Sequence, residues 1–227
     1  MNLFLSAAER HVQPRDTMIV KCIKNPDAFK IQDEQTNAVY YGCNQEWYPT
    51  KWQRRSGCGP TTSTTILQYL YATRKNSAPS PLTKGSCLQC MEDVWKYVTP
   101  GPQGISSTQK LCKGLGAYAH AKSLHLRTDA LDIPRFRNKR PPFSETLAFL
   151  DKALENDLPV AFLNLHNGQE PILDPWHWVT IISMEYQPDH SKAFVGILDE
   201  GLRKYIDFSV WFHTTLWGGG LVAFDIL

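Results

Sequence analysis

Near residue 157 of this 227-residue chain, the spacing of the apolar residues changes from a helical to an extended pattern. Ahead of that point, Ile66, Leu67, Leu70 and Tyr71 recur at intervals of three and four residues, as on one face of a helix. The same spacing, bounded by serine, glycine and proline signals, predicts four helices in this part of the chain. They are expected over residues 61–76, 86–98, 107–121 and 144–156.

After residue 157, short runs rich in β-branched and aromatic residues predict strands instead of helices. These strands are expected at residues 159–165, 178–182, 193–198, 204–208 and 221–226, with two further short ones at 29–31 and 39–41. The loops between the later strands are too short for helical crossovers, so antiparallel pairing is favoured. Helices followed by an antiparallel sheet indicate an α+β fold.

The composition fits a chain that folds around its own apolar core. Hydrophobic residues make up 42% of the chain and charged residues 20%, and the net charge is +2. We therefore expect no nucleic-acid partner. No stretch approaches the roughly 20 apolar residues of a membrane helix, so no membrane partner is expected either. The N-terminal residues have no basic leader, which makes the cytoplasm the expected location. Nothing in the sequence sets the oligomeric state.

Six cysteines occur in the chain, and two of them, Cys87 and Cys90, have the CxxC spacing of metal and redox sites. A zinc site would need a second pair of ligands, and no matching CxxC, CxxH or HxxxH motif is present. We interpret the two cysteines as structural thiols along one helix, with metal binding and redox chemistry as the alternatives. No metal and no other cofactor is predicted.

Cys58 occupies a turn, Gly57-Cys58-Gly59-Pro60, immediately before the first predicted helix. Pro60 suits the first turn of a helix, where an N–H group would lack a partner. The unpaired N–H groups of that turn stabilise an anion, so thiols at helix starts ionise more readily than ordinary thiols. The flanking glycines should let a carbonyl substrate approach the sulfur. Cys58 is therefore a candidate nucleophile, with a small buried thiol as the alternative.

A thiolate nucleophile works best with an imidazole that later protonates the leaving group. Of the seven histidines, His177 lies directly at the head of a strongly β-patterned run, between Trp176 and Trp178. A side chain at a strand start can face a helix terminus across a cleft, and the two indoles should shield it from water. His166, which ends another predicted strand, is the second candidate for the base. A hydrogen-bonded structural histidine is the alternative for His177.

The imidazole also needs an acceptor for its other nitrogen, which fixes its tautomer and stabilises its charge. Asp199 ends the strand that follows the one headed by His177. If these strands pair across the turn near residues 188–189, the two side chains lie close together. Glu200 should point to the opposite face of the strand, and Asp207 lies one strand further along the chain.

Gln53 precedes Cys58 by five residues and is our candidate for the oxyanion donor. Its side-chain amide would act together with the backbone N–H of Cys58 on the developing negative charge. Gln45, further upstream, is the reserve candidate. A surface glutamine in a loop is the alternative interpretation of Gln53.

The segment Ser56-Gly57-Cys58-Gly59-Pro60-Thr61-Thr62, preceded by a glutamine, resembles the nucleophile segment of papain-like cysteine peptidases. A His-Trp-Val sequence at a strand start and an aspartate at a later strand end follow in the order of that family. The pattern is most similar to the bacterial branch that includes the bacteriocin-leader-processing peptidases. The resemblance covers about residues 45–210. It implies a papain-like fold with Cys58 as nucleophile, His177 as base, Asp199 as orienting acid and Gln53 as oxyanion donor.

We therefore predict a cysteine peptidase-like hydrolase that cleaves a peptide or amide bond through a thioester. Residues 45–227 are expected to form the peptidase domain, and residues 1–44 an N-terminal arm whose role the sequence leaves open. One alternative is an acyltransferase or a small-amide amidase on the same fold. Another is a non-catalytic binding protein with a papain-like fold.

Overall fold

The computed structural model describes residues 18–74 and 82–226. The predicted end of the first helix at Asn76 therefore lies outside the described residues, as do residues 1–17 of the predicted arm. The helices are α1 (Lys51–Ser56), α2 (Cys58–Arg74), α3 (Lys84–Trp95), α4 (Thr108–Ala121), α5 (Phe143–Glu155) and α6 (Phe208–Thr214). Short 3₁₀ helices occur at Pro26–Phe29, Gln45–Trp47 and Arg137–Lys139.

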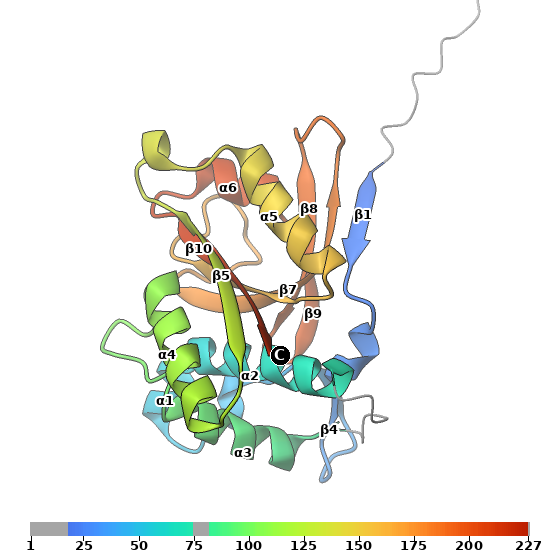
Figure 1. Ribbon diagram of the computed structural model, residues 1–227, viewed down its shortest axis with the longest axis vertical. Helices are drawn as coiled ribbons and strands as arrows, with labels where there is room; N and C mark the ends of the chain where they lie inside the picture. Colours follow the sequence, from blue (N-terminus) through green and yellow to red (C-terminus); the bar gives the residue numbers. More distant parts are fainter. Residues whose placement is uncertain (1–17, 75–81, 227) are drawn as a thin grey trace, which may run out of the picture.

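A sheet of seven antiparallel strands is the centre of the fold, and a small three-stranded sheet lies apart from it. The seven strands are β1 (Ile19–Cys22), β5 (Leu126–Ile133), β6 (Val160–Asn164), β7 (His177–Tyr186), β8 (Ala193–Asp199), β9 (Leu202–Asp207) and β10 (Gly219–Ile226). The small sheet contains β2 (Lys30–Gln32), β3 (Val39–Tyr41) and β4 (Leu82–Thr83). Figure 1 shows α1 to α4 gathered at the lower end of the molecule, and α5 and α6 at the upper end. The predicted α+β class and the antiparallel pairing are confirmed.

The longest strand, β7, connects the parts of the main sheet. One of its edges pairs with β6 over residues 177–181 and then with β1 over residues 183–186. Its other edge pairs with β8, and the strand order is β5-β10-β6-β7-β8-β9. The described residues before position 45 therefore contribute a strand to the main sheet as well as two strands to the small one.

Helix α2 is buried along most of its length. Every residue from Cys58 to Leu70 is buried, because α2 packs between the sheet and α3. The hydroxyl groups of Ser63, Thr64 and Thr65 donate to carbonyl groups one turn earlier in the helix; Ser63, for example, donates to the carbonyl of Gly59 at 2.9 Å. The helix begins at Cys58, earlier than the predicted start at residue 61. Its first residue is thus held against the sheet.

The sequence patterns missed several elements that are short or mostly polar. β5 is mostly exposed, so polar side chains dominate its sequence. α6 follows directly on β9, where Asp207 caps it by accepting a hydrogen bond from the N–H of Val210 at 2.9 Å. The short elements β1 and α1 were also missed. Within the described part of the chain, no helix combines the length and apolarity needed to cross a bilayer.

Candidate active site

Three element ends meet between the sheet and α2. Cys58 is the first residue of α2, His177 the first residue of β7 and Asp199 the last residue of β8. The predicted pairing of the two strands is confirmed, with Thr180 opposite Leu198. This register brings the head of β7 beside the tail of β8, and His177 Nε2 lies 2.7 Å from Asp199 Oδ1.

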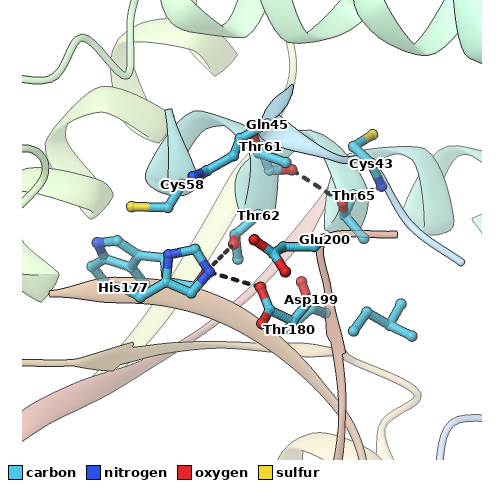
Figure 2. A pocket seen from close by; sticks show the side chains of 12 residues that line it. Cys43, Gln45, Cys58, Thr61, Thr62, Thr65, His177, Thr180, Asp199 and Glu200 are labelled. Carbon is cyan, nitrogen blue, oxygen red and sulfur yellow. Dashed lines mark hydrogen bonds and ion pairs between the residues drawn. The ribbon is translucent and has the colours of Figure 1, made fainter. Parts of the chain in front are cut away.

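The Cys58 thiol lies on the other side of the imidazole. Figure 2 shows its sulfur beside the His177 ring, away from the edge that contacts Asp199. Both residues line a small space of about 20 Å³, enough for about one water molecule. The structure therefore brings together the three residues predicted as nucleophile, base and orienting acid, with His177 between Cys58 and Asp199.

Burial and charge act in opposite directions on this group. Burial lowers the pKa of the His177 imidazole, but hydrogen bonds to Asp199 and Cys58 outweigh burial and raise it to about 10. Burial raises the pKa of the Asp199 carboxyl, but the hydrogen bonds and charges of His177 and Lys204 lower it below its ordinary value of 3.8. The arrangement thus favours an imidazolium beside a carboxylate over two neutral groups.

Lys204, on β9, is a second cationic partner of Asp199 that no sequence signal indicated. Its Nζ lies 2.7 Å from Asp199 Oδ2, so each oxygen of the carboxylate has its own partner. The Asp199 side chain is only 3% exposed, which explains why a buried carboxylate keeps its charge here. Lys204 also contacts Glu200 at 3.4 Å. Leu202 pairs with Asp199, so Lys204, two residues further along β9, lies on the same face of the sheet as Leu202.

Gln53 does not lie where the sequence prediction put it. Its side-chain Oε1 accepts a hydrogen bond from the N–H of Thr50, and the N–H of Gln53 donates to the Thr50 hydroxyl, which together form the capping box of α1. It does not line the space that Cys58 and His177 share. Gln45, the reserve candidate, does line that space, and Figure 2 shows its side chain beside Cys58. Its buried Oε1 has no hydrogen-bond partner among the described residues.

The glycines around Cys58 allow close packing. A Cβ atom on Gly57 would lie 2.5 Å from the carbonyl oxygen of Gln53, and one on Gly59 would lie 2.8 Å from Cγ1 of Ile105. The carbonyl of Ile105 in turn accepts a hydrogen bond from the indole of Trp178 at 2.6 Å. These contacts fix the loop that contains residues 101–105 against the start of α2 and the start of β7.

Of the two tryptophans expected to shield His177, only Trp178 is buried. Trp176 is 46% exposed and has a backbone φ of 58°. It lines an open cleft of about 540 Å³ together with Trp52, Arg55 and Cys58. Cys58 therefore lies between the small polar space shared with His177 and a larger cleft that is open to solvent.

Of the remaining candidates, His166 and Asp207 lie elsewhere, whereas Glu200 lines the same small space as Cys58 and His177 instead of pointing away from it as expected. The Nδ1 atom of His166 accepts a hydrogen bond from the N–H of Gly168 at 3.0 Å, and the ring packs against Trp217. Asp207 caps α6. Glu200 contacts Lys204, while the carboxylate that contacts the imidazole is that of Asp199. Their partners give these side chains structural roles.

Cys87 and Cys90 lie on α3, as predicted, but in different environments. Cys87 is fully buried, and its sulfur lies 3.2 Å from Nε2 of Gln68. Cys43 shares the same glutamine, at 3.5 Å from Oε1. Cys90 is exposed. Within residues 18–74 and 82–226, no three histidine, cysteine or acidic side chains come together as a set of metal ligands.

No protein-family model matches this chain, and no curated protein matches it in sequence. Among solved structures, the chain is similar to UfSP from C. elegans, a cysteine protease of papain-like fold, with a TM-score of 0.52 and 12% sequence identity. The match covers 94% of this chain and 35% of UfSP. The fold is therefore papain-like, as predicted. The likeness concerns the fold alone and gives no support to the bacteriocin-leader-processing branch.

Proposed function

We propose that this chain is a cysteine-dependent hydrolase that cleaves a peptide or amide bond through a thioester on Cys58. The observation that carries the proposal is the order of three side chains, with the Cys58 thiol and the Asp199 carboxylate on opposite sides of the His177 imidazole. A thiol, an imidazole and an orienting acid in this order are the parts that thiol acyl transfer needs. The papain-like fold, shared with a cysteine protease, supports the same function.

The first step uses the thiolate of Cys58 and the imidazolium of His177. The sulfur attacks the carbonyl carbon of the substrate, a C–S bond forms, and the carbonyl oxygen becomes negatively charged. His177 then gives its proton to the leaving amine as the C–N bond breaks. The products of this step are a free amine, a thioester on Cys58 and a neutral His177.

The second step reverses the proton transfer. Neutral His177 takes a proton from a water molecule, whose oxygen attacks the thioester carbon. The C–S bond breaks, the carboxylic acid leaves, and the Cys58 thiolate and His177 imidazolium are restored. An added amine that competed with water at this step would be detected as a transfer product by mass spectrometry.

Two further groups have supporting roles in this proposal. Asp199 stabilises the imidazolium through the 2.7 Å contact and holds the ring so that its other nitrogen faces the sulfur. The side-chain amide of Gln45 and the backbone N–H of Cys58 are the proposed donors to the oxyanion. Gln45 takes this role in place of Gln53, whose side chain is used in the cap of α1.

The reactivity of the six cysteines tests the proposal without knowledge of the substrate. Intact protein is treated with iodoacetamide at pH 6, and alkylation of each cysteine is followed by peptide mass spectrometry. Cys58 is only 9% exposed, whereas Cys22 and Cys90 are exposed. Ordinary accessibility therefore predicts that Cys58 reacts more slowly than these two, and an activated thiolate predicts the opposite.

A matched pair of variants completes the test. His177→Asn should abolish the fast alkylation of Cys58, because the imidazolium partner is lost. His120→Asn, a change of the same kind at an exposed position on α4, should leave it intact. If Cys58 reacts no faster than Cys22 in the wild-type protein, the hydrolase proposal is wrong and the non-catalytic binding alternative is favoured.

A further inference from the structure

The cleft that opens beside Cys58 has the size of a ligand site. Its volume of about 540 Å³ lies within the range of roughly 300–1,000 Å³ typical of such sites. One wall comes from α1, with Trp52 and Arg55, and another from Gln103 in the loop fixed by Ile105. Trp176, immediately before His177, forms part of the lining as well. The cleft is thus built from elements whose positions are set by the same contacts as the candidate active site.

Two half-exposed indoles line this cleft. Trp52 is 47% exposed and Trp176 is 46% exposed. Indole rings have a large apolar surface, and covering that surface is favourable. The aromatic surface continues beyond the cleft, because the ring of Trp176 packs edge to face against Trp217 at 5.6 Å. Trp217 is itself 40% exposed. An extended chain with an apolar side chain would cover part of this surface.

The charge of the cleft comes from one arginine. Arg55 is exposed and makes no ion pair or hydrogen bond with another described side chain or carbonyl group. Its neighbour Arg54 differs, because its guanidinium donates to the carbonyl groups of Tyr48 at 2.7 Å and Pro49 at 2.9 Å. Arg54 is therefore used in the structure of the turn before α1, while the guanidinium of Arg55 is available to a ligand.

No carboxylate balances this charge within the described lining of the cleft. The remaining lining residues are neutral, including Ser56 and Gln103. A guanidinium in a partly enclosed, neutral site favours an anion, and its planar fork matches a carboxylate through two parallel hydrogen bonds. A basic ligand would meet an uncompensated like charge at the same place.

We propose that the cleft binds an acidic peptide segment of the substrate. A carboxylate side chain of this segment pairs with Arg55, and a neighbouring apolar side chain lies against Trp52 and Trp176, next to the carbonyl that Cys58 attacks. This inference rests on the proposed hydrolase function and adds the substrate class. Arg55 becomes a specificity-determining residue, and the two indoles supply apolar contact.

The test uses an internally quenched hexapeptide library in which each position in turn is fixed as Glu, Gln or Lys. The full-length protein should cleave peptides with Glu at one position roughly 10-fold faster than peptides with Lys there, measured as kcat/KM at low salt. The preference should shrink as salt is added. Arg55→Gln should abolish it, and Arg55→Glu should reverse it in favour of Lys.

Lys51 supplies the matched control, since it is an exposed cation on the same helix that does not line the cleft. Lys51→Glu should leave the preference for Glu unchanged, and circular dichroism should show that all three variants are folded. Iodoacetamide, which is small and uncharged, reports the reactivity of Cys58 in each variant.

The outcomes separate the two proposals. If Cys58 is reactive, any one of three results overturns the inference about the cleft and leaves the hydrolase proposal standing. The protein shows no preference for Glu, its preference for Glu survives Arg55→Glu, or it does not cleave the library. A Cys58 that reacts no faster than the exposed cysteines overturns the hydrolase proposal, and the inference about the cleft with it.

Discussion

The contact between His177 and Asp199 makes a prediction that needs no substrate. Asp199→Asn keeps the shape of the side chain and removes its charge. A hydrogen bond to a charged group contributes about 1.5–3 kcal/mol and a neutral one about 1 kcal/mol. Since one pKa unit corresponds to about 1.4 kcal/mol, the substitution should lower the pKa of His177 by about one unit. The 2.7 Å separation and the burial of the carboxylate put the effect at or above this size.

The assay is a histidine NMR titration of the full-length protein. The wild-type imidazole of His177 should titrate near its raised pKa of about 10, and in the variant at a clearly lower pH. Glu200→Gln is the matched control. Glu200, like Asp199, contacts Lys204, but the carboxylate that contacts the imidazole is that of Asp199. Its titration curve for His177 should stay close to that of the wild type.

Stability gives a second measurement with a defined sign. Because folding raises the pKa of His177 above its ordinary value of 6.5, the stabilisation is complete below pH 6.5 and is lost as the pH rises through about 10. In the wild type, the free energy of unfolding in urea should fall as the pH rises through this window. In Asp199→Asn, the same fall should occur at lower pH. A wild-type His177 that titrates near pH 6.5, or a variant with an unchanged midpoint, would refute the reasoning.

Two other predictions concern the neighbours of this pair. Lys204→Met leaves Asp199 buried with one cationic partner fewer, so the free energy of unfolding at pH 7 should fall by about 1–3 kcal/mol. The folded-state pKa of Asp199 lies below 3.8, so the loss should disappear as the pH falls through it; equal stability of the two proteins at pH 7 would contradict the role of Lys204. Gln45→Ala should lower kcat by about 10²-fold if Gln45 is the oxyanion donor. Gln53→Ala should leave kcat unchanged and lower the free energy of unfolding by about 0.5–1 kcal/mol through loss of the cap. A fall in kcat for Gln53→Ala and none for Gln45→Ala would instead identify Gln53 as the oxyanion donor.

Local sequence signals were sufficient for most of the architecture. Runs with helical spacing and runs of β-branched residues each lie within one element, and the short turns between the later strands leave antiparallel neighbours as the simplest arrangement. The closeness of His177 and Asp199 followed from the same reasoning, because the two residues flank one hairpin. β5 escaped detection because its side chains are mostly exposed, and α6 because its seven residues are too few to show a helical period.

Proximity in sequence misled the choice of glutamine. Gln53 is close to Cys58 along the chain, but its side chain completes the capping box of α1 with Thr50. Gln45 is more distant in sequence, but in the folded chain it lines the same space as Cys58. Hydrogen bonding within the first turn of a helix decides where such a side chain points, and the sequence alone did not show that α1 exists.

The sequence by itself determined the order of most helices and strands, the place of Cys58 at a helix start and the pairing of His177 with Asp199. Only the tertiary structure decided that Lys204 holds the second oxygen of Asp199 and that Arg55 faces the cleft. The physical reason is the sequence distance over which each kind of signal acts. Periodicity and turn signals act between residues a few positions apart, whereas a charge or an indole acquires its partners from elements that packing brings together.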